Sequence, residues 1–429
     1  DIIKPLNVKA ILVGHGHTKL KMNFEGFPGI MGRSTLRTAK VETGYNIVNI
    51  TNDSILFSEK IVNKEELPCW HKLSTNEKID KKKEYPRPDF NVNSEFPDIK
   101  LKWSFDCNHT VTAEPVTTTK GILVASRSGL FLLDKMSGKK IWKFSTKGAF
   151  FAAPAADDYN VLITSTDGNI YSLKLKTGKL QWKFPTGKPV VSVPLIKSNH
   201  VYFGSAGKFY KLDIREGKKI WEFDFSEGFV ESKPAICDNK IVFGAWSTFL
   251  YCLDVESGNL LWKWSNEKKA VLLSPAVCYP VITDGMVFIV APDRYMTVID
   301  LETGKKIFRT NRNYVREAIG ISEDSALIFT KSMYDSAFAY RIKDDTLLLE
   351  WKQDLKFGYD FAPSYPIEKN GTLFFGVKNG YLYALSAVTG DLKWRFRVCS
   401  SLVNNVLPIS DKEVIVTSLN GRVYYLFTK

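Results

Sequence analysis

The sequence lacks several features that define common protein classes. Its 429 residues contain no apolar run approaching about 18 residues, so no segment has the length of a membrane-spanning helix. The six cysteines form no C-x-x-C or adjacent pair, which argues against zinc-ribbon and redox motifs and leaves at most one chance disulfide; they are Cys69, Cys107, Cys237, Cys252, Cys278 and Cys399. The chain begins with Asp1 rather than Met and shows no recognisable signal peptide. We therefore expect it to be a processed or trimmed piece of a longer protein.

Acidic residues are outnumbered, and the net charge of +13 comes from 59 Lys+Arg against 46 Asp+Glu. A basic chain can attract nucleic acid, acidic glycans or lipid headgroups. Most lysines, however, occur in turns such as Gly138-Lys139-Lys140, which favours a solvated surface over an anionic partner. Because arginines and aromatics are not interleaved, we expect no nucleic-acid partner.

A repeat of about 40 residues begins near residue 100. Most copies have a strand with alternating residue types, a tight turn closed by glycine, and an aromatic anchor four residues later; the segment 168–184 is the clearest copy. The anchors step along the chain by 39, 40, 39, 41, 46, 43 and 43 residues; they are Trp103, Trp142, Trp182, Trp221, Trp262, Phe308, Trp351 and Trp394. Such a period, with four strands per copy, predicts an all-β fold made of radial propeller blades.

The end of the chain predicts how the ring of blades closes. Residues 402–428 contain three strands without a fourth, at 402–409, 413–419 and 422–428, and residues 100–105 form a lone strand ahead of the first full copy. Pairing the three strands with the lone one makes an eight-bladed β-propeller of four-stranded blades with no open edge. Seven blades is the alternative if Trp103 is not an anchor.

Two copies, Tyr251–Trp262 (YCLDVESGNLLW) and Tyr383–Trp394 (YALSAVTGDLKW), carry the pattern A-L-D-x-x-T-G-x-x-x-W most clearly. This pattern resembles the tryptophan-docking repeat of β-propellers of the pyrroloquinoline quinone (PQQ) type, over about residues 100–429. The resemblance implies that the tryptophans join blades, and that the protein is periplasmic or secreted in a bacterial envelope. Quinoprotein dehydrogenases of this type also need an adjacent cysteine pair and a calcium-binding Glu/Asn/Asp set. No Cys-Cys occurs here, so we expect no PQQ.

Residues 1–62 do not follow the repeat. A short apolar run, 8–13, ends in Gly14-His15-Gly16-His17, and the segments 45–50 and 55–60 predict a hairpin around Asn52-Asp53. A strand ending in G-H-x-H and followed by such strands resembles the C-terminal end of calcineurin-like metallophosphoesterases. That family binds two divalent metal ions (Mn, Fe or Zn), and the resemblance assigns His17 to the first and His15 to the second.

The other metal-binding motifs of that family, D-x-H, G-D-x-x-D and G-N-H, are missing from this chain. Two neutral imidazoles without carboxylates cannot hold two divalent ions. We therefore expect phosphoester hydrolysis only in a longer parent protein, and neither a bound metal nor catalytic residues in this chain. Residues 1–62 are interpreted as a β-rich remnant of an α/β metallophosphoesterase domain. Residues 63–99, with four prolines and mixed charge, are interpreted as a linker, and residues 100–429 as the propeller.

Candidate ligand-binding residues lie where the innermost strand of each blade begins. We aligned the copies by a proline in that strand, at positions 115, 154, 194, 234, 275, 363 and 408. Polar residues and one tryptophan near this position predict a binding mouth; they are His109, Glu114, Glu231, Lys233, Trp246, Arg316, Glu317, Asp360, Asn404 and Asn405. A solvated channel with internal ion pairs is the alternative.

Three functions remain open from the sequence. The propeller is either a binding module fused to a phosphoesterase, an envelope scaffold that contacts partner proteins, or, least favoured, a quinoprotein dehydrogenase. We expect a monomer whose propeller mouth binds a protein or a glycan.

Overall fold

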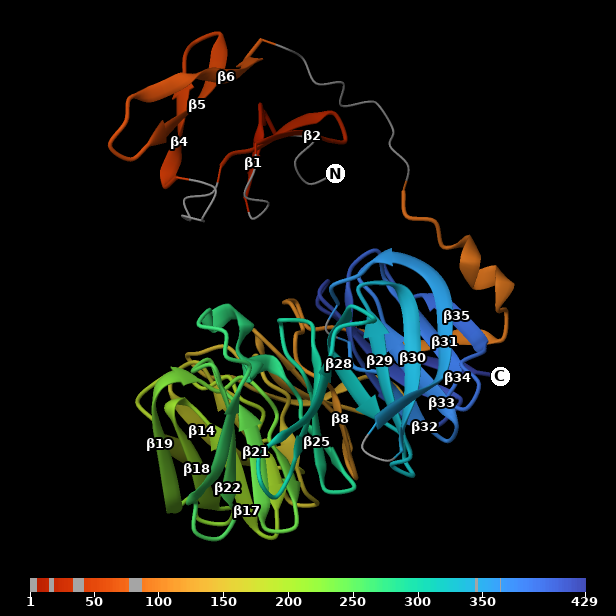
Figure 1. The fold of residues 1–429 in the computed structure, drawn as a ribbon. Coiled ribbons are helices and arrows are strands. Elements are labelled where there is room, and N and C mark those ends of the chain that lie inside the picture. Colours follow the sequence, from red (N-terminus) through yellow and green to blue (C-terminus); the bar gives the residue numbers. More distant parts are fainter. Residues whose placement is uncertain (1–5, 15–18, 34–41, 77–86, 344–345, 363) are drawn as a thin grey trace. The chain divides into compact units, whose positions relative to one another are not determined.

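The computed structural model describes residues 6–14, 19–33, 42–76, 87–343, 346–362 and 364–429. The chain forms two compact units, residues 1–88 and 89–429. Within the described ranges the only helices are three short 3₁₀ turns, η1 (Asn91–Glu95), η2 (Val271–Leu273) and η3 (Pro275–Val277). None of them has the length and apolar character needed to span a bilayer. The described chain is therefore an all-β protein (Figure 1).

The first unit contains two three-stranded sheets. In one, β1 (Ile11–Val13) pairs in parallel with β3 (Phe27–Met31), which also pairs with β2 (Leu20–Phe24). In the other, β4 (Gly44–Ile50) and β5 (Ser54–Ile61) form the predicted hairpin, and β6 (Glu66–Ser74) adds to β5. Phe57 and Ile30 are buried in a small core with Trp70 packed against them. Our interpretation of 63–99 as a linker was wrong at 66–74, because these residues form a strand that pairs along the edge of β5.

The second unit consists of eight four-stranded antiparallel sheets among the described residues. Seven of them are simple meanders of consecutive strands. Sheet 1 is β8 (Val116–Thr118), β9 (Gly121–Ser126), β10 (Gly129–Leu133) and β11 (Lys140–Phe144); sheet 2 is β12 (Ala155–Ala156), β13 (Asn160–Ser165), β14 (Asn169–Lys174) and β15 (Leu180–Pro185); sheet 3 is β16 (Leu195–Lys197), β17 (His200–Gly204), β18 (Ala206–Asp213) and β19 (Lys219–Phe229); sheet 4 is β20 (Ala235–Cys237), β21 (Lys240–Gly244), β22 (Phe249–Asp254) and β23 (Leu260–Ser265). Sheet 5 is β24 (Val281–Thr283), β25 (Met286–Val290), β26 (Met296–Asp300) and β27 (Lys306–Thr310); sheet 6 is β28 (Val315–Ile321), β29 (Leu327–Ser332), β30 (Tyr334–Lys343) and β31 (Thr346–Tyr359); sheet 7 is β32 (Ile367–Lys369), β33 (Thr372–Gly376), β34 (Tyr381–Ser386) and β35 (Leu392–Arg397).

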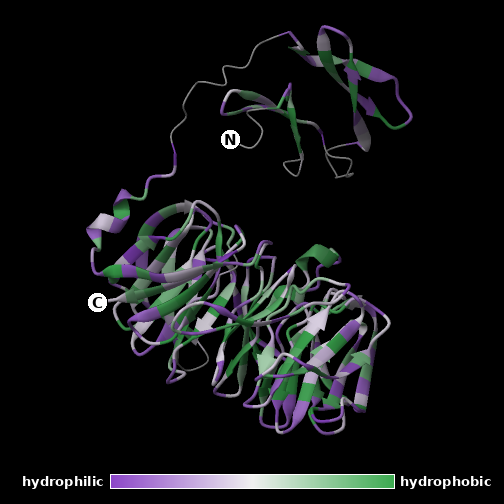
Figure 2. Cartoon of the chain, turned by 180° about the vertical axis from the view of Figure 1, so that it is seen from behind, coloured by the Kyte–Doolittle hydropathy of each residue, from purple (hydrophilic) through white to green (hydrophobic). Residues whose placement is uncertain are grey.

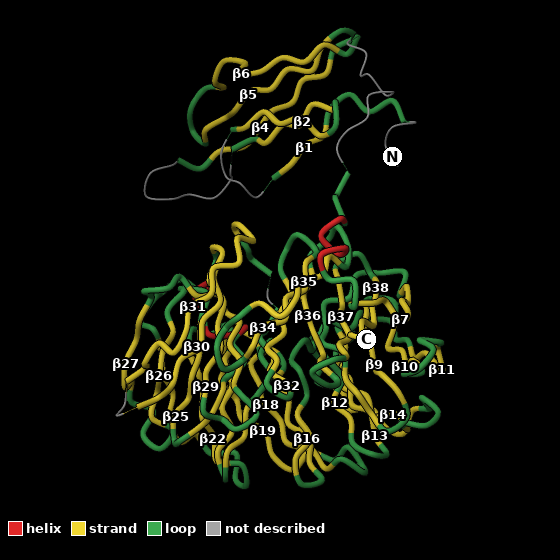
Figure 3. Tube along the Cα trace, turned by 90° about the vertical axis from the view of Figure 1, so that its right-hand side faces the viewer, coloured by secondary structure: helices red, strands yellow, loops and turns green. Residues whose placement is uncertain are grey.

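Sheet 8 joins the two ends of this unit. Its first three strands, β36 (Val403–Pro408), β37 (Glu413–Ser418) and β38 (Arg422–Thr428), come from the C-terminus, and its fourth is β7 (Ile99–Asp106). The predicted pairing of three C-terminal strands with the lone strand is therefore confirmed. The 3₁₀ turn η1, just before β7, lies beside β35, where Asn93 Nδ2 donates to the Arg397 carbonyl at 3.0 Å (Figure 3).

Apolar clusters connect the sheets in series. Each of eight buried clusters takes residues from two consecutive sheets, and one of them joins sheet 8 to sheet 1 through Ile415, Val423 and Val124. In Figure 2 hydrophobic residues follow the strands, while hydrophilic residues are frequent in the loops. Burial of these faces against each other is the main stabilising contribution expected for stacked sheets.

The tryptophan anchors join neighbouring sheets through a repeated contact. The indole of Trp142 in sheet 1 lies over Gly178 in the third turn of sheet 2, and its Nε1 donates to the Leu175 carbonyl at 2.9 Å. Gly178 has φ +66° and leaves room for the ring because it has no Cβ. The same contact occurs six times, in the pairs Trp103–Gly138, Trp142–Gly178, Trp182–Gly217, Trp221–Gly258, Trp262–Gly304 and Trp351–Gly390. The role predicted for the anchors is therefore confirmed in these pairs.

The two ends of the sheets carry different loops. At one end, which we call the crossover face, the chain passes from each sheet to the next and turns from second to third strand. At the other end, the turn face, it turns from first to second and from third to fourth strand. The tryptophan–glycine contacts lie at the turn face, where aspartates such as Asp254 close the third turn by accepting from the Ser257 backbone N–H at 2.7 Å.

Candidate functional site

The first strands of the sheets line a common space, which we call the hub. Register places one residue of each sheet at the same level: Glu114, Ala153, Val193, Lys233, Tyr279, Ile319, Tyr365 and Asn405. Ile319 and Asn405 lie within β28 and β36, and each of the other six lies two positions before its inner strand begins. This differs from our alignment at Pro275, Pro363 and Pro408. Because β24 begins at Val281 and β32 at Ile367, the equivalent prolines are Pro280 and Pro366. Several crossovers carry more than one proline, and the sequence alone did not show which one precedes the strand.

Two tyrosines at this level meet in the hub. The rings of Tyr279 and Tyr365 are stacked with centroids 4.3 Å apart and planes 10° from parallel. The Tyr365 hydroxyl donates to the Val277 carbonyl at 3.3 Å, and Tyr279 packs against Ala152, Ala153 and Val193 from sheets 2 and 3. The Tyr279 side chain of sheet 5 therefore reaches across the hub, and the Tyr365 side chain of sheet 7 stacks on it.

The tyrosine pair separates two cavities, and both tyrosines line each of them. The crossover-side cavity has a volume of about 470 Å³ and contains Phe151, Phe229, Glu231 and Asn405 in its wall. The turn-side cavity has a volume of about 550 Å³ and reaches Ser325 in the first turn of sheet 6. We call the stacked tyrosines the hub partition.

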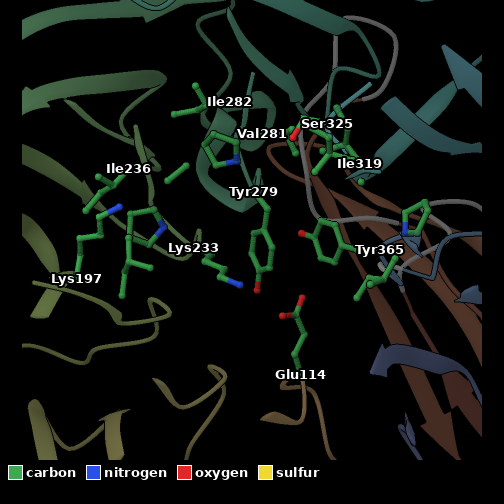
Figure 4. Close-up of a pocket in the computed structure, with 18 residues that line it drawn as sticks. Glu114, Lys197, Lys233, Ile236, Tyr279, Val281, Ile282, Ile319, Ser325 and Tyr365 are labelled. Atoms are coloured by element: carbon green, nitrogen blue, oxygen red, sulfur yellow. The ribbon is translucent and has the colours of Figure 1, made fainter. Parts of the chain in front are cut away.

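The turn-side cavity combines apolar walls with a few polar groups. Leucine, isoleucine and valine side chains from β16, β20, β24, β28 and β32 line it, together with one alanine and three prolines. Glu114 and Lys233 point toward the hydroxyl of Tyr279 at the partition (Figure 4). Desolvation raises the pKa of the Glu114 carboxyl, while the Lys233 ammonium acts in the opposite direction. Burial also raises the pKa of Tyr279 well above its usual value, and the carboxylates of Glu114 and Glu231 add to this rise.

The structure brings part of the predicted mouth together. Glu114 and Lys233 share the turn-side cavity, and Glu231 lines the crossover-side cavity together with Asn405. Trp246 lies in the turn between β21 and β22, where its Nε1 donates to Glu231 at 3.0 Å and its ring lies 5.9 Å from that of Phe229. Of these five residues, Glu114 and Lys233 therefore lie on the turn side of the hub partition, Glu231 and Asn405 on its crossover side, and Trp246 at the crossover face.

Two of the predicted residues, Asp360 and Asn404, make internal hydrogen bonds, although Asn404 Oδ1 is buried without a hydrogen-bond partner among the described residues. Asp360 is 1% exposed and pairs with Lys331, whose Nζ lies 2.7 Å from its carboxylate. The same carboxylate accepts from the backbone N–H of Lys378 at 2.8 Å. The amide of Asn404 is buried and donates to the carbonyls of Val111 and Thr112 at 2.9 and 3.0 Å, which links sheet 8 to the segment entering sheet 1. These contacts hold both side chains within the fold, and the ligand-binding role that we expected for them stays a prediction.

The remaining predicted residues do not join this group. His109 is exposed in the crossover before sheet 1, and Glu317 lies on β28; burial raises the pKa of Cys278 and Tyr365, and the charge of Glu317 adds to this rise. The side chain of Arg316 and the residues His15 and His17 lie outside the described residues. All six cysteines are free thiols, and four of them are buried.

Sequence reasoning missed the hub partition. The signal was present: Cys278-Tyr279-Pro280 and Ser364-Tyr365-Pro366 match Ser192-Val193-Pro194 and Ser232-Lys233-Pro234. In this motif the small residue is buried and hydrogen-bonds to the second strand. In sheet 4, for example, the Gly244 backbone N–H donates to Ser232 Oγ at 3.2 Å. The middle residue then lies at the hub, so a tyrosine there predicts an aromatic group inside it.

The crossover face exposes a second group of aromatic side chains. Tyr334, Tyr359 and Phe361 contact one another through ring pairs 5.6 and 6.2 Å apart, and Phe361 is 49% exposed. The Lys378 ammonium lies 4.8 Å from the centroid of Tyr359. We call Tyr334, Tyr359, Phe361 and Lys378 the aromatic patch. On the same face Leu272 of η2 is 75% exposed.

Comparison with known proteins gives the family. The family model described as "Outer membrane protein assembly factor BamB" matches residues 100–233, 127–263, 207–340 and 339–428. The chain belongs to this family. The BamB family assignment covers the eight sheets, and it agrees with the resemblance to PQQ-type propellers expected from the tryptophan repeat.

Individual relatives are distant. The chain is 22% identical to outer membrane protein assembly factor BamB of Yersinia pestis over 337 residues, which cover 76% of this chain and 75% of that protein. It is 30% identical over 139 residues to a tetrathionate hydrolase of Acidithiobacillus ferrooxidans, where the match covers 30% of this chain and only 28% of that enzyme. The crystal structure of BamB from Moraxella catarrhalis superposes with a TM-score of 0.61 at 17% identity, covering 77% of this chain and 99% of that one. This likeness shows a β-propeller fold.

Proposed function

We propose that residues 100–429 form a closed, eight-bladed β-propeller that acts as a scaffold in a bacterial envelope and binds a partner protein through its crossover face. The pairing of β7 with β38 and the apolar clusters that join each sheet to the next support the blade count and the closure. The family name, which refers to outer-membrane protein assembly, supports the location and the class of function.

The observation that carries the proposal is the aromatic patch. Exposed, mutually contacting aromatic rings beside a cation are unusual on a surface that faces only water. Aromatic residues are enriched in protein–protein interfaces, where they supply much of the binding energy. Leu272 and the Trp246 ring on the same face extend the apolar surface available to a partner.

A charge substitution in the patch tests the proposal. We expect the variant Tyr359→Glu/Phe361→Glu, tagged and expressed in the native host, to lose co-purification of the envelope proteins that the unaltered chain retains. The control is Tyr159→Glu, because Tyr159 is an isolated side chain that is 80% exposed at the turn face. Equal retention by both variants, each folded by circular dichroism, would rule out the crossover face as the docking surface.

A glycan is the second class of partner, because sugars also stack on exposed aromatic rings. Protease treatment of the envelope fraction before capture distinguishes the two classes. Loss of binding after treatment supports a protein partner, whereas unchanged binding favours a glycan. We expect the chain itself to be a monomer, which sedimentation at several concentrations tests.

Fusion to a metallophosphoesterase remains a separate proposal, supported by the Gly14–His17 motif. The described strands β1–β6 are compatible with the β-rich remnant expected there. They do not by themselves support metal binding. We expect the chain as given to show no metal-dependent hydrolysis of p-nitrophenyl phosphate. The sequence of the gene upstream of Asp1 tests the fusion, which requires D-x-H, G-D-x-x-D and G-N-H motifs in that order.

A further inference from the structure

The turn-side cavity has an arrangement of polar groups that the scaffold function does not use. Lys233, the Tyr279 hydroxyl and the Glu114 carboxyl converge at its inner end (Figure 4). Among the described residues, none of these three groups has a hydrogen-bond partner, and no carboxylate lies within 4.0 Å of the Lys233 Nζ. Polar groups that converge without partners inside an otherwise apolar cavity are typical of a ligand site.

The wall of this cavity is suited to an apolar body. Five consecutive sheets contribute the residue two positions beyond the hub level, and all five are apolar and half-buried: Leu195, Ala235, Val281, Ile321 and Ile367. The cavity volume of about 550 Å³ lies in the range of small-molecule sites, about 300–1,000 Å³. The hub partition closes the inner end, so a ligand enters from the turn face.

The charges at the inner end select the head group. Lys233 carries a full positive charge, and Lys197 adds a second ammonium to the same lining; no described carboxylate lies within 4.0 Å of Lys197 either. Glu114 is desolvated, which favours its neutral form, and a protonated carboxyl donates a hydrogen bond. With Tyr279, these groups offer three donors toward one point. A carboxylate accepts up to about four hydrogen bonds, whereas an amine would meet the Lys233 ammonium.

We propose that the turn-side cavity binds a single-chain amphiphilic carboxylate, a fatty acid of medium length, with its carboxylate at Lys233, Tyr279 and Glu114 and its chain along the apolar wall. Binding is non-covalent and does not depend on the crossover face. The site lies on the opposite side of the hub partition from the aromatic patch.

Decanoate, titrated calorimetrically into the full chain, is the probe. We expect decanoate to bind and decanol and decyltrimethylammonium to bind at least about tenfold more weakly, because decanol carries no negative charge and decyltrimethylammonium has a positive charge and no hydrogen-bond acceptor. Equal binding of decanol and decanoate would overturn the assignment of the head group.

Matched variants locate the site. Lys233→Met should weaken decanoate binding at least about tenfold, a typical effect of losing one charge-assisted hydrogen bond. Lys183→Met removes the same charge from the outer strand β15 and should leave binding unchanged. Ala235→Phe places a ring in the cavity and should abolish binding while the thermal transition persists. Wild-type affinity in both Lys233→Met and Ala235→Phe would overturn the proposal.

Glu114 provides a test by pH. The groups that face it are Lys233, Tyr279 and Tyr365, and burial raises the pKa of the Glu114 carboxyl, so that it ionises at a higher pH than an exposed glutamate. Ionisation of Glu114 at the higher pH places a second negative charge beside the ligand, so affinity should fall as pH rises. Glu114→Gln should keep binding and remove this pH dependence. Loss of binding in Glu114→Gln, or an unchanged pH dependence, would contradict the proposed role of Glu114.

Discussion

The tryptophan–glycine contact between sheets gives a prediction whose magnitude follows from the structure. A Cβ added to Gly178 would lie 2.7 Å from Cδ2 of the Trp142 indole, and Gly178 has φ +66°. Alanine in this left-handed conformation costs about 1–2 kcal/mol. Forcing the buried ring to move adds about 1–3 kcal/mol, as for other overpacked sites. We therefore expect Gly178→Ala to lower the free energy of unfolding by about 2–5 kcal/mol.

The chain offers a matched control for this substitution. Gly187 has φ +72°, but a Cβ built on it meets no atom within 4 Å. Gly187→Ala should therefore lower the free energy of unfolding only by the cost of the left-handed backbone conformation, about 1–2 kcal/mol. The difference between the two variants measures the contact with Trp142 separately from the strain of the glycine conformation.

Guanidinium unfolding followed by tryptophan fluorescence is a suitable assay, because nine of the ten tryptophans lie beyond residue 100. Midpoints are compared at an unchanged denaturant slope, so that the difference reports stability. A double-mutant cycle that combines Gly178→Ala with Trp142→Phe adds a second readout, since the smaller ring should tolerate the added methyl group better. If Gly178→Ala and Gly187→Ala lower the free energy of unfolding by the same amount, the indole contact does not stabilise the packing of the sheets and the reasoning is refuted.

Three further predictions concern other parts of the chain. Lys331→Met should lower stability by about 3–5 kcal/mol, because it leaves the buried Asp360 carboxylate unpaired, and Lys331→Met/Asp360→Leu should recover part of the loss in the same unfolding assay. Hydrogen bonds from Ser257 hold the pKa of Asp254 below its usual value of 3.8. The ionised carboxylate therefore stabilises the fold above pH 3.8, and this stabilisation is lost as the pH falls through the lower pKa of the folded state. Asp254→Ala should make the thermal midpoint less sensitive to acid. The absorbance of PQQ with Ca²⁺ should not change on adding the chain, and a bound, shifted spectrum would contradict our expectation that no quinone binds.

Much of the fold was accessible from the sequence because it repeats. The anchors Trp142 and Trp182 recur with their turn glycines at a nearly constant step, and each such pair is a local signal of a contact between distant strands. The lone strand before the first copy could be matched to the incomplete last copy in the same way. These inferences needed only period and pattern, which are properties of the chain itself.

The hub was less accessible, since its residues meet only in three dimensions. Tyr279 and Tyr365 are separated by 86 positions, and although the motif before each inner strand places both tyrosines at the hub, it does not show that their rings stack. The buried ion pair of Asp360 could not be predicted, because its partner Lys331 lies on β29, 29 positions earlier in the chain. The segment 66–74 was mistaken for a linker because its pairing with β5 depends on an exposed strand edge rather than on its own composition.

The scaffold function depends on which face of the propeller meets a partner. Hydrogen–deuterium exchange of the full chain, free and bound to the envelope protein that it captures, measures this directly. We predict slowed exchange in the crossover loops around Trp246, Leu272 and Phe361, and unchanged exchange in the first turns of the turn face, such as that at Tyr159. Protection confined to the turn face, with the crossover loops exchanging at the same rate in both states, would contradict the account.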